Sequence, residues 1–294
     1  MGVKRPAGPF LKWAGGKARL APRILERAPV RFGRYHEPFL GGGAVFFAFA
    51  DAGRAKGARL SDANAALIAC YRAVRDEPGA VADGLAPMAE AYLAREAGER
   101  AAYYYAVRAS APGVPAEAAA RLIFLNRTGY NGLYRENRKG GFNVPHGRYV
   151  KPRILDRDGL MAAANALRGV TLCAGDFEQA CAAATAGDFV YLDPPYQPLS
   201  ATSRFTAYTR GEFDPSEQER LRDTFEAMTR RGVAALLSNS DHARIRELYG
   251  ERGFGFETVM MSRAINSVGS GRTPIAELLI DNFGRAEVRR ALEG

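Results

Sequence analysis

Short runs of apolar residues alternate along this chain with stretches in which apolar residues recur at helical spacing. The runs at 34–39, 58–61, 169–174, 188–192 and 233–237 predict buried strands, and those at 256–262 and 275–280 predict a terminal hairpin. Helical spacing, as at Leu221, Phe225 and Met228, predicts helices between them. Near residue 40 the pattern predicts a strand, a glycine turn and a helix in succession. This is how a nucleotide-binding βαβ unit begins, and it indicates an α/β fold.

Two parts of the chain have clear helix signals but contain no candidate functional residues. Residues 78–120 are rich in Ala, Glu and Arg at helical spacing and predict structural helices of an inserted domain, with a break at Pro112-Gly113-Val114-Pro115. Asp214-Pro215-Ser216-Glu217 is a strong helix start, with an N-cap, a proline at N1 and a glutamate at N3. Residues 197–213 have no periodicity, and we expect them to form a loop over a pocket.

The strand at 188–192 stops at Asp193-Pro194-Pro195-Tyr196. Proline has no N–H for a sheet ladder and disfavours helix in the residue before it. We therefore expect Asp193 at the carboxyl end of a buried strand, followed by a rigid rim where ligands of open α/β sheets bind. A fixed carboxylate and proline carbonyl accept the two N–H bonds of an exocyclic amine, and Tyr196 offers a stacking face. The alternative is a proline-terminated strand with a solvent-facing acid.

The glycine turn Leu40-Gly41-Gly42-Gly43 departs from the dinucleotide fingerprint, because its third glycine falls on Phe46. A bulky side chain there disfavours a pyrophosphate cofactor and suits one with a single nucleoside. Asp62 ends the next predicted strand about 20 residues beyond Gly41, where an acid accepts ribose hydroxyls. Alternatively, Asp62 is the N-cap of the helix that carries Leu67.

Two further segments carry candidate ligand-binding residues. Asp176-Phe177 follows the strand at 169–174. In this position Asp176 could accept the amine of the cofactor's adenine while the Phe177 ring lies on the base. Alternatively, Asp176 is only a helix N-cap. The segment Trp13-Ala14-Gly15-Gly16-Lys17 is not a P-loop, which requires a glycine at Leu11 and a Ser or Thr at Ala18. Its glycine pair allows a ligand to approach the backbone closely, Trp13 offers an aromatic wall, and Lys17 offers a partner for a carboxylate. The alternative is a plain glycine turn before a helix.

Composition narrows the class of protein. The 294 residues are 47% hydrophobic and 25% charged, which suits one core with an insertion, or two domains. The three cysteines and three histidines are scattered, so neither a disulfide framework nor a metal site is expected. The amino terminus leads into no apolar run long enough for a signal peptide or membrane span, and we expect a cytoplasmic protein.

The net charge of +9 is concentrated in one segment. Residues 121–153 hold eight basic side chains and one acidic one, Glu136. Aromatic, asparagine and arginine residues alternate there through a glycine-punctuated loop and a predicted hairpin. Arginines bind phosphates or read guanine edges, and aromatic rings stack on bases or wedge between them. This pattern predicts a nucleic-acid contact surface, and the alternative is a solvated basic loop. Arg263 and Arg272, in the terminal hairpin loop, are candidates to face the same nucleic acid.

Three of these motifs resemble those of one known family. Asp193-Pro194-Pro195-Tyr196 resembles the signature of amino-methylating, S-adenosylmethionine-dependent methyltransferases. Phe10–Lys17 resembles the opening motif of Dam-type DNA adenine methyltransferases, and residues 122–149 resemble their target-recognition segment. The motifs span nearly the whole chain in the family's order, so the chain is identified as similar to Dam-like, D12-class (alpha-group), site-specific DNA adenine-N6 methyltransferases.

The resemblance implies a role for each matching residue. Asp193 and the carbonyl of Pro194 hold the amine of a flipped adenine, Tyr196 stacks on its ring, and Pro195 completes the catalytic tetrapeptide. The implied cofactor-binding residues are Trp13, Ala14, Gly15, Lys17, Glu37, Phe39, Gly41, Asp62, Asp176, Phe177 and Asp193. The implied DNA-binding residues are Lys12, Arg127, Tyr130, Asn131, Leu133, Arg135, Asn137, Asn143, Pro145, Arg148 and Tyr149.

Within the DNA-binding set, Tyr130 is expected to wedge beside the displaced base pair, Asn131 to lie at the backbone and Arg135 to read base edges. Leu133, Pro145 and Tyr149 assist that reading. Tyr134 and His146 fall at variable points of the family pattern, which leaves the target sequence open, although GATC is the family's commonest target.

The implied fold is α/β, a Rossmann-like S-adenosylmethionine-dependent methyltransferase sheet with an inserted, mainly helical target-recognition domain plus a β-hairpin. Residues 1–64 and 161–294 form the catalytic domain, and residues 65–160 the recognition domain. The implied cofactor is S-adenosylmethionine, with S-adenosylhomocysteine as its product, and no metal is expected. The partner is double-stranded DNA, with no membrane contact. We expect a monomer in solution, acting alone or beside a cognate restriction endonuclease.

Two other interpretations remain. An RNA adenine or DNA cytosine-N4 methyltransferase shares the tetrapeptide. A sequence-specific DNA-binding protein with a vestigial catalytic site belongs to a different class, in which the recognition segment is active and the cofactor does not bind.

Overall fold

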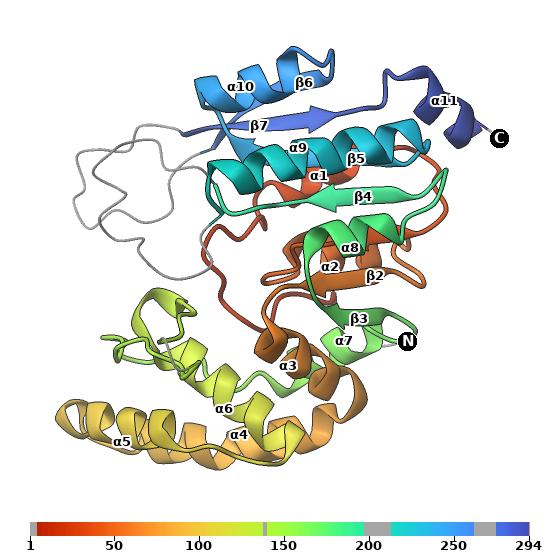
Figure 1. Cartoon of the computed structure of the whole chain (residues 1–294). Coiled ribbons are helices and arrows are strands. Elements are labelled where there is room, and N and C mark those ends of the chain that lie inside the picture. Colours follow the sequence, from red (N-terminus) through yellow and green to blue (C-terminus); the bar gives the residue numbers. More distant parts are fainter. Residues whose placement is uncertain (1–4, 138–139, 197–212, 262–274, 294) are drawn as a thin grey trace. The chain divides into compact units, whose positions relative to one another are not determined.

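The computed structural model describes residues 5–137, 140–196, 213–261 and 275–293. Most of the predicted loop at 197–213, and both Arg263 and Arg272, lie outside these ranges. The chain is a mixed α/β protein with two compact units (Figure 1). Unit one comprises Met1–Arg27, Leu40–Ala58 and Asp62–Ala174, and unit two comprises Ala28–Phe39, Arg59–Ser61 and Gly175–Gly294. The predicted division into a catalytic domain (1–64 and 161–294) and a recognition domain (65–160) is defined by function, and it remains a prediction.

A seven-stranded sheet has the order β3-β2-β1-β4-β5-β7-β6 (Figure 1). Its strands are β1 (Tyr35–Glu37), β2 (Arg59–Asp62), β3 (Thr171–Ala174), β4 (Phe189–Leu192), β5 (Ala234–Ser240), β6 (Gly255–Met261) and β7 (Ile275–Asp281). Strand β1 pairs in parallel with β2 and β4, and β4 pairs in parallel with β5. Strand β7 is antiparallel to β5 and β6. The predicted strands and the terminal hairpin are confirmed, and β5 continues three residues beyond its predicted end.

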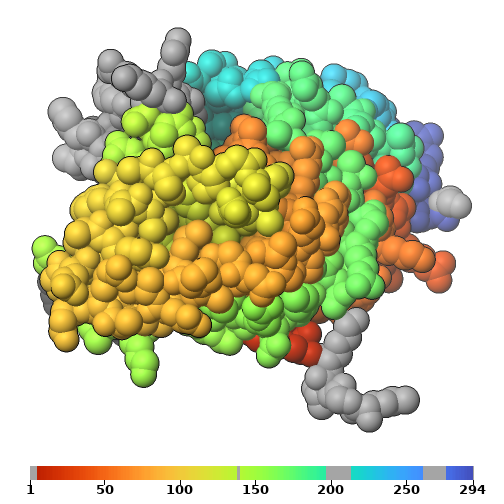
Figure 2. All heavy atoms as spheres, turned by 90° about the horizontal axis from the view of Figure 1, so that it is seen from below, coloured from red at the N-terminus to blue at the C-terminus, as the bar shows by residue number. Residues whose placement is uncertain are grey.

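Unit one is mainly helical. Its helices are α1 (Ala21–Arg27), α2 (Ala44–Asp51), α3 (Ala65–Asp76), α4 (Pro78–Leu93), α5 (Ala97–Ala109), α6 (Pro115–Thr128) and α7 (Arg157–Ala166). The predicted break falls between α5 and α6, and α6 begins with Pro115 at N1, where the missing N–H costs nothing. Seen from below, the yellow and orange atoms of α4 and α5 form the nearest surface of this unit (Figure 2). The expected helices at 78–120 are confirmed.

Unit two packs helices against the central strands. Its helices are α8 (Phe177–Ala182), α9 (Pro215–Arg230), α10 (Ala243–Gly250) and α11 (Ala286–Glu293). The predicted start of α9 is confirmed, because Asp214 accepts hydrogen bonds from the backbone N–H groups of Ser216 and Glu217. All four residues of β4 are buried, as expected for a strand covered on both faces. The core thereby fixes the position at which β4 ends, immediately before Asp193.

Candidate functional site

A hydrogen bond from the next strand holds the acid at the end of β4. The Oγ of Ser238 donates to Oδ1 of Asp193 at 2.9 Å, and the hydroxyl of Tyr191 lies 2.8 Å from the same Oγ. Ser238 and Tyr191 are completely buried, whereas Asp193 is partly exposed. The parallel register of β4 and β5 pairs Leu192 with Leu237, which brings Ser238 opposite Asp193. The orientation of this carboxylate is therefore built into the sheet.

Two more partly buried polar contacts hold the rest of the rim, which we define as Asp193–Tyr196. The side chain of Gln218 on α9 donates to the carbonyl of Pro195 at 3.3 Å and accepts from Asn239 on β5 at 3.2 Å. The hydroxyl of Tyr196 donates to Glu277 on β7 at 2.8 Å. Burial raises the pKa of Tyr196 well above its ordinary value, with Asp193 and Glu277 adding to the effect, so this hydroxyl stays protonated.

Sequence reasoning did not find the residues that support the rim, which are Tyr191, Gln218, Ser238, Asn239 and Glu277. A signal was present in Ser238-Asn239-Ser240, a run of three polar residues that ends an otherwise apolar strand. All three are buried, and buried polar side chains normally have hydrogen-bond partners.

Phe39, Asp176 and Phe177, predicted to bind the cofactor, come together in unit two. The rings of Phe39 and Phe177 stack with centroids 5.3 Å apart and an angle of 27°. Asp176 is the N-cap of α8, and its Oδ2 pairs with Arg220 at 2.7 Å. The hydrogen bond from Arg220 lowers the pKa of Asp176, so the acid is ionised and able to accept hydrogen bonds. The N-cap interpretation is confirmed, and the role of Asp176 toward the cofactor stays a prediction.

Glu37 occupies the end of β1 in the same unit. Its side chain is buried, and its Oε2 accepts the hydroxyl proton of Tyr35 at 2.7 Å. Burial, followed by the charge of Glu37, raises the pKa of Tyr35 well above its ordinary value, so the hydroxyl remains a donor.

In unit one the glycine turn after β1 accommodates Trp13. Gly41 has a φ of 48°, in the left-handed region, and a Cβ there would lie 2.7 Å from Cδ1 of Trp13. A Cβ on Gly42 would lie 3.1 Å from the Trp13 Cβ. The turn therefore requires glycine partly because the indole occupies the space of a side chain. The structure thus brings the predicted cofactor residues Trp13 and Gly41 into contact.

Asp62, at the end of β2, holds this turn in place. Its Oδ2 accepts the N–H of Gly41 and its Oδ1 accepts the N–H of Asn64, both at 2.9 Å. The N-cap of α3 is Asn64, whose side chain accepts the N–H of Leu67, so the N-cap interpretation of Asp62 is wrong. The cap is Asn64 because both carboxylate oxygens of Asp62 already accept the N–H groups of Gly41 and Asn64. Burial raises the pKa of Asp62.

The remaining predicted cofactor residues of unit one lie in the segment after Trp13. Ala14 and Gly15 are exposed. The Lys17 side chain is buried, and its Nζ donates to the carbonyl of Gly15 at 2.7 Å. An ammonium group buried beside an exposed glycine backbone is a suitable partner for a small carboxylate.

Most of the predicted DNA-binding residues lie in one loop of unit one, residues 129–149, here called the recognition loop. Bridges between Gly129 and His146 and between Glu136 and Phe142 support the hairpin predicted there. Asn131 has a φ of 53°, in the left-handed region, and the neighbouring Tyr130 is exposed. The predicted DNA residues that are exposed in this loop are Tyr130, Asn131, Leu133, Arg135, Asn137, Pro145 and Arg148, while Asn143 and Tyr149 are partly buried.

Side chains tie the recognition loop to itself and to the amino-terminal segment. The guanidinium of Arg135 donates to the carbonyl of Asn143 at 2.7 Å. The Nζ of Lys12 lies 3.9 Å from the ring centroid of Tyr149, a cation–π contact between two predicted DNA-binding residues.

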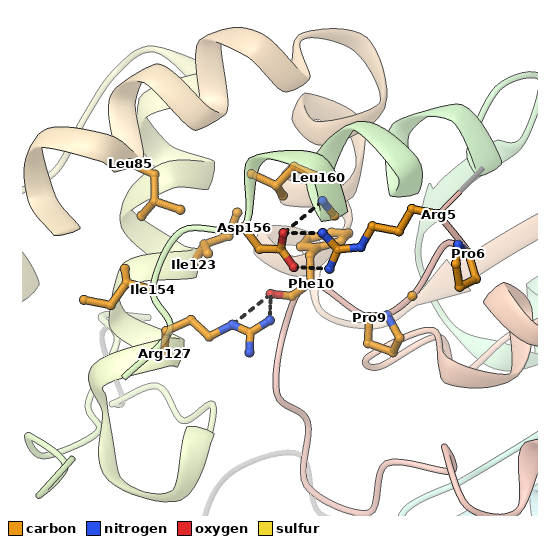
Figure 3. A pocket seen from close by; sticks show the side chains of 12 residues that line it. Arg5, Pro6, Pro9, Phe10, Leu85, Ile123, Arg127, Ile154, Asp156 and Leu160 are labelled. Carbon is orange, nitrogen blue, oxygen red and sulfur yellow. Dashed lines mark hydrogen bonds and ion pairs between the residues drawn. The ribbon is translucent and has the colours of Figure 1, made fainter. Parts of the chain in front are cut away.

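Arg127 points into unit one. Its guanidinium donates twice to the carbonyl of Phe10, at 3.2 and 2.9 Å, and lines a cavity of about 100 Å³ (Figure 3). Across that cavity Arg5 pairs with Asp156, the N-cap of α7. Arg121 likewise donates to backbone carbonyls at the end of α5. Two arginines of the basic segment therefore have structural partners.

Comparison with known proteins identifies the family. The profile described as "D12 class N6 adenine-specific DNA methyltransferase" matches residues 13–265. The chain belongs to this family. Type II methyltransferase M1.LlaDCHI from Lactococcus lactis is 38% identical over 284 residues, covering 94% of this chain and 95% of the relative. Type II methyltransferase M.MjaIII from Methanocaldococcus jannaschii is 38% identical over 288 residues (94% and 99%), and the DNA adenine methylase of Escherichia coli K12 is 35% identical over 271 residues (92% and 93%).

The protein is thus an enzyme, an adenine-specific DNA methyltransferase, and the Dam-like resemblance is confirmed. A D12-class methyltransferase uses S-adenosylmethionine and acts on DNA. Within the described residues, no three His, Cys, Asp or Glu side chains gather where they would hold a metal ion. The described helices include none long and apolar enough to cross a membrane.

Proposed function

We propose that this methyltransferase holds a flipped adenine at the Asp193–Tyr196 rim and binds S-adenosylmethionine beside it, at the carboxyl edge of the sheet. The observation that carries this proposal is the rigid support of the rim. Ser238 bonds Asp193, Gln218 bonds the Pro195 carbonyl, and Glu277 bonds Tyr196. Supporting residues of this kind fix a site before substrate arrives, and preorganisation is what a positioning enzyme needs.

The strand registers support a common location for the cofactor and catalytic residues. His36 pairs with Val190, and Glu37 pairs with Leu60. Continued by three residues, the first of these registers runs from Phe39 to Asp193, both in unit two. Because β2, β1 and β4 are parallel neighbours, their carboxyl ends share one edge of the sheet.

The chemistry of the donor set fits S-adenosylmethionine. Its adenosine needs flat apolar faces and acceptors for hydroxyl and amine protons, which the Phe39–Phe177 pair and the acids Asp62 and Asp176 offer. Its amino-acid part carries a carboxylate, for which Lys17 is the proposed cation. The other proposed contacts are Trp13, Ala14, Gly15, Glu37, Gly41 and Asp193. When bound, the cofactor supplies a methyl group made electrophilic by the sulfonium.

The rim residues orient the nucleophile. Asp193 and the Pro194 carbonyl accept hydrogen bonds from the two N–H groups of the adenine N6 amine. This leaves the nitrogen lone pair aimed at the methyl group. Tyr196 stacks on the ring, and its bond to Glu277 fixes the plane of the phenol. Alignment of this kind supplies roughly 7–11 kcal/mol. An amine inside a duplex is unreachable, so the adenine swings out at a cost of a few kcal/mol.

The recognition loop is the proposed DNA-contacting segment. Exposed Tyr130 wedges beside the vacated base position, Asn131 contacts the backbone, and Arg135 reads a base edge. Leu133, Asn137, Asn143, Pro145, Arg148, Tyr149 and Lys12 complete the proposed contacts, whereas Arg127 acts through its bonds to Phe10. Because GATC is the commonest target of the Dam-like enzymes that the chain resembles, we propose a GATC-like target.

We further propose a monomer located in the cytoplasm, where DNA and the methyl donor meet. Two relatives are named type II methyltransferases, which favours a cognate restriction endonuclease as a partner of this enzyme.

Incubation with labelled S-adenosylmethionine and duplex DNA, followed by nucleoside analysis, tests the reaction. We expect label only in N6-methyladenine, and label in N4-methylcytosine or in RNA alone would contradict the proposal. A duplex carrying 2-aminopurine at the target tests flipping. Its fluorescence should rise on binding, and no rise would contradict extrusion of the base.

A further inference from the structure

Trp13, the only tryptophan of the chain, joins two segments of unit one that have different proposed roles. Its indole packs against the glycine turn at Gly41 and Gly42. It also stacks on Tyr134 of the recognition loop, with ring centroids 5.6 Å apart and an angle of 27°. One side chain of the proposed cofactor site therefore contacts the proposed DNA-reading loop directly.

Tyr134 is well anchored within that loop. Its ring meets Phe142 edge-on, with centroids 5.6 Å apart and an angle of 78°, and its hydroxyl donates to Glu136. The next residue, Arg135, is the proposed base reader and closes the loop on the carbonyl of Asn143. A displacement of the Tyr134 ring would therefore shift the backbone that carries Arg135.

Tyr134 also reaches Asn64, two residues after the proposed ribose acid Asp62. Burial raises the pKa of its phenol, as does the bond to Glu136, whereas a hydrogen bond with the Asn64 side chain acts in the opposite direction. Asn64 donates its own N–H to Asp62. Tyr134 thus touches both Trp13 and the turn that follows β2.

A second contact joins the amino-terminal segment that carries Trp13 to the recognition loop, through the backbones of Lys12 and Gly132. The amide of Asn126 accepts the N–H of Lys12 at 2.7 Å and donates to the carbonyls of Lys12 at 2.8 Å and Gly132 at 3.0 Å. Asn126 is 1% exposed. Gly132 has a φ of 63°, and a Cβ there would lie 2.5 Å from the Lys12 Cβ. The two segments are therefore packed too closely to move independently.

We propose that Tyr134 is a positioning residue that couples cofactor binding to DNA binding through its stack on Trp13. This inference rests on the proposed function, because it needs Trp13 to contact the cofactor and the recognition loop to contact DNA. A ligand that orders Trp13 orders Tyr134 and the loop, and DNA that orders the loop orders Trp13. By linkage, each ligand raises the affinity for the other by the same factor.

The test uses the emission of Trp13 to follow binding of S-adenosylhomocysteine, with and without a saturating target duplex. The ratio of the two dissociation constants is the coupling factor, about 5 to 150 for a coupled enzyme. In Tyr134→Ala we expect the factor to fall about two- to twelvefold, the value of a stacked aromatic pair. Tyr134→Phe keeps the ring and should keep the factor.

A control variant separates coupling from general damage. Tyr103→Ala removes another partly exposed tyrosine of unit one, on α5, whose ring packs on Phe124 of α6, and it should leave the factor unchanged. If Tyr134→Ala does not fold, Tyr134→Leu removes the aromatic face while retaining apolar volume.

A coupling factor of one in the wild type, or an unchanged factor in Tyr134→Ala, would overturn the inference. Tyr134→Phe losing the factor would also overturn it, because the hydroxyl and not the stack would then carry the effect. Failure of the proposed function is a separate outcome, namely no binding of S-adenosylhomocysteine and no methyl transfer by the wild type.

Discussion

The plane of the Asp193 carboxylate is set by a hydroxyl on the neighbouring strand. Ser238 has a single proton, and the 2.9 Å contact to Asp193 is shorter than its 3.4 Å contact to the Leu192 carbonyl. The buried hydroxyl of Tyr191 needs an acceptor, and Ser238 provides one at 2.8 Å. This arrangement directs the proton of Ser238 toward the acid.

Ser238→Ala should therefore lower kcat about 10- to 150-fold while changing KM for either substrate less than about twofold, because a hydrogen bond to a charged group is worth about 1.5–3 kcal/mol. Steady-state kinetics measure both constants. Ser110→Ala, which deletes an exposed hydroxyl bonded to Val107, is the matched control. An unchanged kcat in Ser238→Ala would mean that Asp193 does not need this support.

At this scale the sequence predicts what is local. Asp193 and its prolines form one tetrapeptide, and the strand before them is legible from its apolar run. The supporting contacts join residues 45 and 81 positions apart, from Asp193 to Ser238 and from Tyr196 to Glu277. Only the strand order brings such residues together, so sequence spacing does not predict them.

At the scale of elements, a buried pair joins the amino ends of β1 and β4. The Nε2 of His36 lies 3.1 Å from Oδ2 of Asp188, and Nδ1 has no hydrogen-bond partner among the described residues. Burial lowers the pKa of His36, and the charges of Arg34 and Arg59 act in the same direction, although Asp188 opposes them. Protonation would place a charge and an unsatisfied N–H in the core.

The free energy of unfolding should therefore fall as the pH decreases below about 6.5, because the unfolded chain binds a proton that folded His36 does not. The slope from this one group is at most about 1.4 kcal/mol per pH unit. His36→Gln keeps a donor for Asp188 and does not titrate, so its slope should be smaller. Urea unfolding between pH 7.5 and 5.5 measures the difference. Equal slopes would show that His36 does not titrate in this range.

Elements with strong end signals are the ones that the sequence predicts well. The start of α9 at Asp214-Pro215 is one case. The cap of α3 is a miss, since both Asp62 and Asn64 are good N-cap residues and only the path of the turn selects Asn64. Helices α7 (Arg157–Ala166) and α11 (Ala286–Glu293) are not predicted.

At the scale of the whole molecule, the net charge of +9 favours a polyanionic partner. The count of basic residues at 121–153 overstates the charge available to DNA, because Arg121 and Arg127 bond backbone carbonyls. Composition gives the total charge, whereas only the fold shows which guanidinium groups remain exposed.

Two exposed arginines should affect DNA binding differently. Arg148→Ala, the loss of a phosphate contact, should weaken binding to all sequences equally and reduce the slope of log K against log salt by about 1. Arg135→Ala should relax the choice of base at one position by about 1–3 kcal/mol. Filter binding to a set of single-base variants over a salt series measures both. The opposite assignment of the two effects would exchange the proposed roles.

The most direct test of the account is the single-turnover rate of methyl transfer by Asp193→Ala. The rate should fall below detection, because the amine loses the acceptor that orients it. The dissociation constant for duplex DNA should stay within a few-fold of wild type. Methyl transfer retained at a rate near that of the wild type would contradict the claim that the Asp193–Tyr196 rim positions the reacting nitrogen.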